Sequence, residues 1–145
     1  MRIDELCGND VPELVRLSGR PGFPFPMNEE TALLYCAGKE GGPVGNHTYG
    51  VFEDDGTLAS VMTVTYFRVF PCDDSPSGMI GHISGAYTHP DHRHKGFASM
   101  ILDRIEADAV RLKADYLCMD SIADDLYLKH GYVKTVKESR LWKII

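Results

Sequence analysis

The sequence predicts an α+β fold in which a mixed, mostly antiparallel twisted sheet carries helices on both of its faces. The first observation is a series of stretches rich in β-branched and aromatic residues between His47 and Thr88, separated by turn signals. The second is an apolar pattern at helical spacing from Phe97, followed by another short apolar stretch. That order is typical of a crossover between parallel strands.

The composition bounds the class of protein. A chain of 145 residues is long enough to bury a real core, and we expect one domain over residues 1–145. The net charge of -6 argues against general nucleic-acid affinity, which needs a basic face. No apolar run approaches the roughly 20 residues of a membrane span, and the N-terminus does not resemble a signal peptide. We expect neither nucleic-acid nor membrane partners.

The cysteines and histidines do not indicate a metal site. Cys7, Cys36, Cys72 and Cys118 lie far apart and form no C-x-x-C pair, which argues against zinc and redox chemistry. The cluster of three histidines around Arg93 and Lys95 is interrupted by these cations, which repel a metal dication. We therefore expect no metal. Unpaired thiols favour a reduced, cytoplasmic setting.

The N-terminal part is expected to hold a strand over Arg2–Cys7, a helix from Asn9 or Asp10 to Ser18, and a helix from Asn28 to Ala37. Asparagine or aspartate can cap each helix, and a glycine follows each end. The segment Gly19–Pro26 between the helices contains three prolines, which forbid regular structure there.

The middle part is expected to form a three-stranded antiparallel meander, with strands over Tyr49–Phe52, Leu58–Phe70 and Met79–Thr88. A hairpin loop over Glu53–Gly56 and a turn over Pro71–Gly78 connect them. Gly81 and Gly85 interrupt the third strand and predict a bulge or the close approach of another backbone.

The C-terminal part is expected to hold a helix over Phe97–Lys113, a strand over Tyr116–Met119, a short helix from Asp120 or Ser121 to Lys129, and a strand over Tyr132–Trp142. The crossover helix makes Met79–Thr88 and Tyr116–Met119 parallel neighbours. The last strand could pair across the edge of a homodimer.

The basic turn Arg93–Ala98 is the most informative motif of the chain. It joins a strand to a helix N-terminus, where free N–H groups and the positive end of the helix dipole favour an anion such as a phosphate. Gly96 allows the backbone to approach a phosphate without a Cβ, and Arg93 and Lys95 add charge. The alternative is a solvated basic turn.

Two segments resemble the GNAT superfamily of acetyl-CoA-dependent N-acetyltransferases. Tyr87–Ala98 is similar to the family's acetyl-CoA signature, a strand end and a proline followed by Arg/Gln-x-x-Gly-x-Gly/Ala. Leu126–Tyr132 is similar to the family's late aromatic-Tyr-x-x-x-Gly-aromatic motif. The resemblance is close over Met79–Tyr132. In the residues before Met79, only the order of the predicted elements resembles the family. It implies a GNAT-like sheet in which the strand before the turn splays from its parallel neighbour.

The resemblance also implies site residues. The residues that would contact acetyl-CoA are Ala86, Tyr87, Thr88, Arg93, His94, Lys95, Gly96, Phe97, Ala98, Ser99 and Ser121. The strand residues among them would act through their main chain. Tyr127 matches the position of the acid that protonates the departing thiolate, and a phenol pKa of about 10 is near a thiol pKa of about 8.5. The alternative is that Tyr127 only packs on its helix.

The base and the acceptor stay open. The two long strands contain no carboxylate, which leaves His82 or a chain of waters as the base. By resemblance, the acceptor would be a primary amine of a small molecule or peptide, bound beside an aromatic wall. That wall would consist of Phe23, Phe25, Met27, Tyr35 and Tyr66. Alternatively, Phe23 and Phe25 only pin the proline-rich loop.

Two other functions remain open from the sequence. A CoA-binding sensor or regulatory module that has lost turnover would also explain the missing strand carboxylate. A nucleotide-phosphate binder unrelated to CoA would use the same basic turn.

Overall fold

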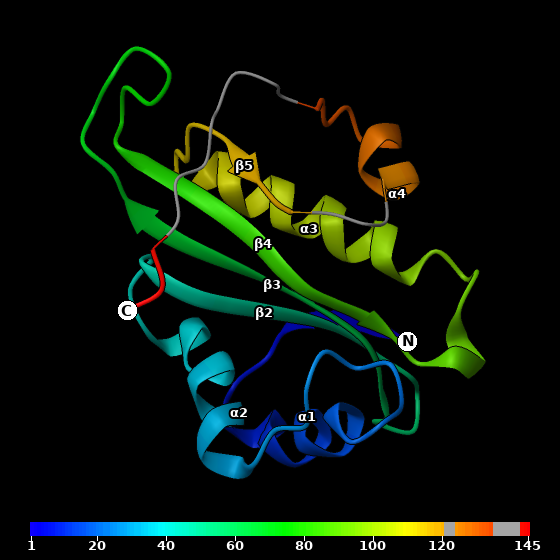
Figure 1. The fold of residues 1–145 in the computed structure, drawn as a ribbon. Coiled ribbons are helices and arrows are strands. Elements are labelled where there is room, and N and C mark those ends of the chain that lie inside the picture. Colours follow the sequence, from blue (N-terminus) through cyan, green and yellow to red (C-terminus); the bar gives the residue numbers. More distant parts are fainter. Residues whose placement is uncertain (121–123, 135–142) are drawn as a thin grey trace.

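The computed structural model describes residues 1–120, 124–134 and 143–145. These residues form a five-stranded sheet in the order β1-β2-β3-β4-β5 (Figure 1). The strands are β1 (Arg2–Glu5), β2 (Gly45–Phe52), β3 (Leu58–Arg68), β4 (Met79–Thr88) and β5 (Leu117–Cys118). The first four strands pair antiparallel, and β4 pairs parallel with β5, so the expected mixed, mostly antiparallel sheet is confirmed.

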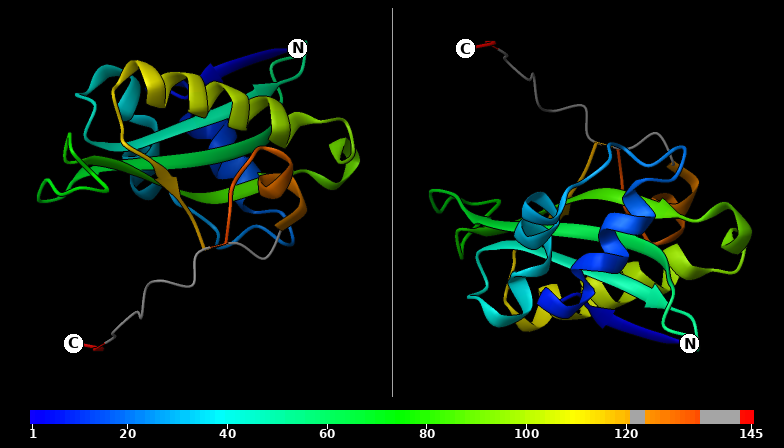
Figure 2. Two further views of the ribbon diagram at one scale, coloured as in Figure 1. Left: turned by 90° about the horizontal axis from the view of Figure 1, so that it is seen from above. Right: turned by 90° about the horizontal axis from the view of Figure 1, so that it is seen from below.

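Helices cover both faces of this sheet, as expected (Figure 2). One face carries α1 (Val11–Ser18) and α2 (Glu29–Cys36), and the other carries α3 (Phe97–Arg111), with α4 (Asp124–Lys129) beside its first half. Short 3₁₀ turns lie at η1 (Gly8–Asp10), η2 (Gly38–Glu40) and η3 (Pro90–His92). None of the helices within the described ranges is long and apolar enough to span a membrane.

Two hydrophobic cores lie between the sheet and the helices, one on each face of the sheet. Beneath α3, the β3 residues Met62, Val64 and Tyr66 pack with helix residues such as Ile101 and Ile105. Beneath α1 and α2, a second core contains Leu14, Leu17, Ala32, Phe52 and Val61. Successive residues of a strand point to opposite faces, so the polar Thr63 of β3 faces α1 and α2.

Several element ends differ from those expected. β2 begins at Gly45 rather than Tyr49, because its first residues pair in register with β3 although their composition does not favour a strand. β1 ends at Glu5 rather than Cys7, and the Cys7 N–H donates a hydrogen bond of 2.8 Å to the Asp10 carboxylate. α3 ends at Arg111, because Lys113 adopts a left-handed backbone with φ of 60°.

The expected strand over Tyr132–Trp142 is wrong at its start, since residues 132–134 are not in a strand. Tyr132 instead follows α4 closely, and its N–H bonds the carbonyl of Tyr127 at 3.1 Å. Residues 135–142, together with most of the edge considered for a dimer, lie outside the described residues.

A buried carboxylate fixes α3 on the sheet. The Tyr49 hydroxyl of β2 donates a hydrogen bond of 2.6 Å to Asp108 of α3. Burial alone would raise the pKa of Asp108, but the bond from Tyr49 and the guanidinium groups of Arg104 and Arg111 lower it. Asp108 therefore stays charged and paired, and it holds the helix whose N-terminus forms part of the candidate site.

A second buried polar pair joins β1 to β2. His47 Nδ1 lies 3.2 Å from Glu5 Oε1, and His47 Nε2 lies 2.9 Å from the Pro43 carbonyl oxygen. Both partners only accept hydrogen bonds, so both ring nitrogens donate when the imidazole is protonated. The hydrogen bond to Glu5 accordingly raises the pKa of His47 above the ordinary value of 6.5.

This pair makes stability depend on pH. Because the pKa of His47 is higher in the folded state, its contribution is full below about pH 6.5 and is lost as the pH rises through the folded pKa. We expect His47→Gln to lower the melting temperature by about 3–10 °C at pH 5.5 and by clearly less at pH 9. Lys39→Gln is the control, since its exposed pair with Asp4 does not titrate in this range. An equal His47→Gln effect at both pH values would contradict the assignment.

Candidate active site

The second half of β4 has an edge that no described strand covers. β4 pairs with β5 only at Gly81 with Leu117 and at His82 with Cys118, and the segment carrying β5 then leaves β4 at an angle (Figure 2). A Cβ at Gly81 would lie 2.7 Å from Leu117 Cδ2, so this glycine makes room for a side chain of β5 and not for the backbone that was predicted to come close. The expected splay of the parallel pair is therefore present.

A β-bulge at Gly85 sets the direction of the main chain along this edge. Val61 pairs with Tyr87 but Thr63 pairs with Ser84, so β4 has one more residue than β3 in the same interval. Gly85 lies in that interval with φ of 65°, a conformation that favours glycine. Of the two alternatives predicted for this glycine, a bulge or the close approach of another backbone, the bulge is the one present.

The main-chain groups beyond the bulge alternate between the two edges of β4. The His89 N–H donates to the Ala59 carbonyl of β3 at 2.8 Å. The Thr88 carbonyl instead accepts a bond of 3.1 Å from Arg93 Nε, on the opposite edge. By the same alternation, Ala86 directs its N–H and C=O to the open edge, where they are available to a ligand.

The turn that follows β4 leads into the N-terminus of α3. No described side chain caps this end of the helix. His94 and Gly96 both adopt left-handed backbone, with φ of 63° and 80°. The first hydrogen bond into the helix runs from the Met100 N–H to the Gly96 carbonyl at 3.0 Å. The N–H groups of Phe97, Ala98 and Ser99 precede it and have no carbonyl partner within the helix, and they lie where the sequence predicts an anion.

The two basic side chains of the turn behave differently. Arg93 folds back on the strand, with its Nε bound to Thr88 and its guanidinium 5.9 Å from the centre of the Tyr87 ring. Lys95 is exposed, and its Nζ lies 3.4 Å from His92 Nδ1. Arg93 therefore also ties the turn to the end of β4, a role that its charge alone does not reveal.

The other expected contact residues that the structure describes lie around this turn. Phe97 is buried in the core under α3, so it can reach a ligand only through its main chain. The Ser99 hydroxyl lies 3.4 Å from His130 Nε2, which joins α3 to the end of α4. The Tyr87 ring packs in the opposite core, where its hydroxyl donates to the Pro21 carbonyl at 3.0 Å. Ser121 lies outside the described residues.

Tyr127 of α4 is a buried phenol at the margin of the α3 core. Its side chain is 8% exposed, and its ring meets the Tyr132 ring edge-on at 5.7 Å. Burial raises the pKa of Tyr127 above its ordinary value. The phenol is therefore protonated at neutral pH, which is the state that a proton donor needs.

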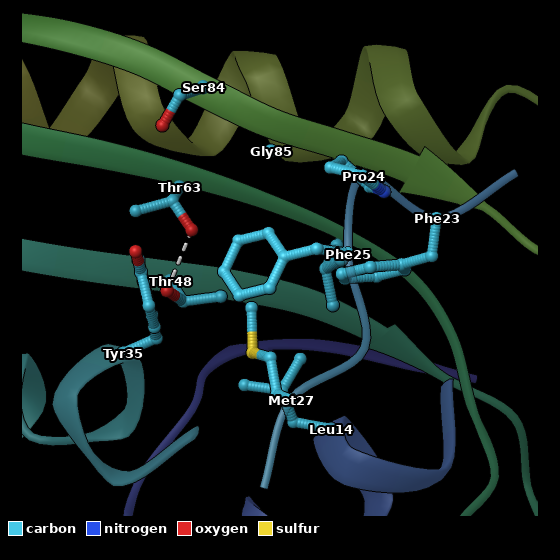
Figure 3. A pocket seen from close by; sticks show the side chains of 11 residues that line it. Leu14, Phe23, Pro24, Phe25, Met27, Tyr35, Thr48, Thr63, Ser84 and Gly85 are labelled. Carbon is cyan, nitrogen blue, oxygen red and sulfur yellow. Dashed lines mark hydrogen bonds between the residues drawn. The ribbon is translucent and has the colours of Figure 1, made fainter. Parts of the chain in front are cut away.

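A pocket of about 240 Å³ lies on the α1 and α2 face of the sheet, against the bulge (Figure 3). It is lined by Leu14, Phe23, Pro24, Phe25, Met27, Tyr35, Thr48, Val61, Thr63, Ser84 and Gly85. The four expected residues Phe23, Phe25, Met27 and Tyr35 are present. Tyr66 is not: it is 0% exposed and points to the α3 face, because it lies an odd number of residues after Thr63.

Thr48 and Thr63 form a part of the pocket that the sequence reading missed. Their hydroxyl oxygens lie 2.8 Å apart, on the neighbouring strands β2 and β3 (Figure 3). The two residues are paired in register.

His82 is poorly placed to be the base. Its side chain is 38% exposed and its Nε2 lies 3.9 Å from Asp120 Oδ2. It is not among the residues that line the pocket. Within the described ranges, Tyr35 is the one titratable residue of the pocket wall.

A comparison with protein families identifies the family of the chain. The family model of the acetyltransferase (GNAT) domain matches residues 32–134. The chain belongs to the GNAT acetyltransferase family. The match includes the pocket strands, the basic turn and Tyr127. A comparison with curated proteins found no match.

Solved structures share the GNAT fold over nearly the whole chain. A protein from Clostridium acetobutylicum, described as a predicted acetyltransferase and solved with acetyl-CoA, is 18% identical with a TM-score of 0.76, over 97% of this chain and 94% of that one. A ribosomal-protein-alanine N-acetyltransferase from Brucella melitensis is 17% identical with a TM-score of 0.68, over 99% and 100%. An aminoglycoside antibiotic 6'-N-acetyltransferase from Acinetobacter haemolyticus is 17% identical with a TM-score of 0.69, over 100% and 99%.

Proposed function

We propose that this GNAT protein transfers the acetyl group of acetyl-CoA to a primary amine of a small molecule or peptide, by direct attack in a ternary complex. One observation carries the proposal: Ser84 and Gly85 lie in the half of β4 that β5 does not cover, and both also line the pocket. A thioester laid along that edge would therefore face an amine held in the pocket. This continuity between two binding surfaces is what a bisubstrate transfer needs.

The residues fit acetyl-CoA. The open main-chain groups of Ala86 suit the amide-bearing pantetheine arm, because strand edges pair with extended chains that carry N–H and C=O groups. The turn Arg93–Ser99 suits the pyrophosphate, and a Cβ at Gly96 would meet nothing within 4 Å, so the space before the helix is open. Ser121 remains a proposed contact from the sequence motif.

The chemistry assigns roles to few side chains. The neutral amine nitrogen attacks the thioester carbonyl, and a main-chain N–H on the β4 edge stabilises the oxyanion. When the C–S bond breaks, the proposed donor Tyr127 gives its proton to the thiolate, and solvent restores it. The proton lost by the amine leaves through water, because the described pocket wall holds no carboxylate or imidazole.

A CoA-binding sensor is the second candidate function, and the same lack of a pocket base among the described residues favours it. The two functions share the acetyl-CoA site and differ only in turnover. A binding measurement therefore tests what they share, and a turnover measurement separates them.

Acetyl-CoA is expected to raise the melting temperature. At a concentration near 100 times Kd the stabilisation is about 2.7 kcal/mol, which corresponds to about 5–10 °C for a chain of this size. ATP at the same concentration is the control and should shift it much less. No shift with acetyl-CoA would overturn both candidate functions, and a larger shift with ATP would favour an unrelated nucleotide site. Release of CoA thiol with a panel of amines then distinguishes an enzyme from a sensor.

A further inference from the structure

We propose that the acceptor is a small monoamine with an apolar, ring-sized body, of the arylalkylamine class. This inference rests on the proposed function, because it assumes that the pocket in Figure 3 receives the amine. It goes beyond that function by excluding polyamines, aminosugars and peptide N-termini. Four features of the pocket carry it: its charge, its polarity, its size and the fixed loop that forms one wall.

The charge of the pocket excludes acceptors with several amino groups. Among the described residues, those lining the pocket include neither an acidic nor a basic side chain. A second ammonium group would enter this space without a carboxylate partner, and a buried unpaired charge is strongly unfavourable. An amine with one nitrogen avoids this cost because it enters neutral.

The polar and the apolar side chains of the pocket lie on different sides. In Figure 3 the hydroxyl oxygens of Tyr35, Thr48, Thr63 and Ser84 gather on one side of the Phe25 ring, whereas Leu14, Phe23, Pro24 and Met27 lie on other sides of it. Ser84 also borders the open edge of β4, where the thioester would lie. The amino group therefore belongs at the hydroxyl side, and the apolar body belongs against the aromatic residues.

The size of the pocket limits that body. A cavity of about 150 Å³ is enough to hold benzene. By proportion, the roughly 240 Å³ here holds about ten non-hydrogen atoms, which is a six-membered ring with a two-carbon arm and a nitrogen. An aminoglycoside or a tripeptide exceeds this volume.

The loop that forms the aromatic wall is held in place. The Tyr87 hydroxyl of β4 binds the Pro21 carbonyl at 3.0 Å, and the Phe23 and Tyr87 rings lie 5.0 Å apart. At the other end of the loop, the Met27 N–H donates to the Ser18 hydroxyl at 2.9 Å. Tethered on both sides, the loop holds its aromatic residues against β4 and fixes the shape of this side of the pocket.

The same apolar wall compensates for the missing base. Transfer of an amine from water into apolar surroundings disfavours its charged form and so lowers its pKa. The neutral amine can still donate a hydrogen bond to a hydroxyl such as that of Ser84 or Thr63. The pocket thereby selects the nucleophilic form that the reaction requires.

The experiment measures kcat/KM with acetyl-CoA for 2-phenylethylamine, 1,4-diaminobutane, kanamycin and a tetrapeptide with a free N-terminus. We expect 2-phenylethylamine to exceed each of the others by about 100-fold, from burial of the ring and exclusion of extra charge. Equal or higher kcat/KM for the diamine, the aminoglycoside or the peptide would overturn the proposal.

Variants locate the effect in the pocket. Phe25→Ser should raise KM for 2-phenylethylamine by about tenfold and leave the Kd of acetyl-CoA unchanged, because Phe25 is 48% exposed and its loss does not open a core. Phe70→Ser is the matched control, since Phe70 is 92% exposed in the turn between β3 and β4. Met27→Glu should shift preference toward 1,4-diaminobutane by supplying a carboxylate.

A binding measurement separates this proposal from the proposed function. Saturation-transfer NMR on 2-phenylethylamine should show contact with the wild-type protein that Phe25→Ser weakens and Phe70→Ser does not. If acetyl-CoA binds but this contact is missing, or is unaffected by Phe25→Ser, the acceptor proposal is wrong and the GNAT function stands. If the contact is present and acetyl-CoA does not bind, the proposed function fails, and the pocket is an amine-binding site without a role as acceptor site.

Discussion

Gly96→Val is expected to raise the Kd of acetyl-CoA by about 100-fold. Gly96 caps α3 with φ of 80°, so any side chain there strains the turn that presents the N–H groups of Phe97, Ala98 and Ser99. The new methyl groups would also stand in the open space before the helix, where a Cβ meets no atom of the protein within 4 Å. Isothermal titration with acetyl-CoA measures the change.

Gly56→Val provides a matched control. Gly56 lies in the hairpin between β2 and β3 with φ of 86°, and a Cβ there also meets nothing within 4 Å. Both variants therefore introduce similar backbone strain into an open turn and should lower the melting temperature by similar amounts. Only Gly96→Val should lose acetyl-CoA. If the two variants bind acetyl-CoA equally well, the α3 N-terminus does not hold its pyrophosphate.

Tyr127→Phe is expected to lower kcat by about 100-fold while the Kd of acetyl-CoA changes less than about twofold. The substitution removes the hydroxyl and keeps the ring that packs against Tyr132. Because burial raises the pKa of Tyr127, its phenol stays protonated from pH 6 to pH 9, and the loss should be similar throughout that range. Stopped-flow or steady-state thiol release at several pH values measures it.

Tyr132→Phe is the control for this role. Tyr132 is the neighbouring ring, and burial likewise raises the pKa of its phenol. Removing its hydroxyl should leave kcat within about twofold of the wild type, since no sequence motif places it at the thiolate. Unchanged turnover in Tyr127→Phe would instead assign Tyr127 to packing, which is the alternative that the sequence left open.

Short sequence patterns predicted the elements that surround the proposed acetyl-CoA site. The bounds of β4 and the start of α3 match the sequence prediction, because glycine, proline and periodic apolar residues act within a few positions of each other. Gly81 and Gly85 were predicted to mark a bulge or the close approach of another backbone. Gly85 lies in a bulge, whereas Gly81 makes room for the Leu117 side chain. These features depend on backbone conformation, which a residue determines largely by itself.

Predictions that depended on partners distant in sequence were less accurate. β2 was expected to begin at Tyr49, because the stretch from Gly45 to Thr48 has no strand composition of its own and becomes a strand only by pairing with β3. Tyr66 was placed on the wrong face, since an aromatic residue suits either side of a sheet. Its side was decided by the register from Thr63 onward.

The sequence by itself determined the sheet with its parallel pair, the glycine turn at the start of α3, and the family to which these residues point. Those features follow from local backbone preferences and hydrophobic periodicity. Only the tertiary structure decided that Arg93 folds back onto Thr88, that Thr48 and Thr63 share a pocket with the loop aromatics, and that this pocket is uncharged along its described wall. The physical reason is that a pocket consists of side chains from several strands and a loop, and their meeting depends on register, twist and packing across long sequence distances.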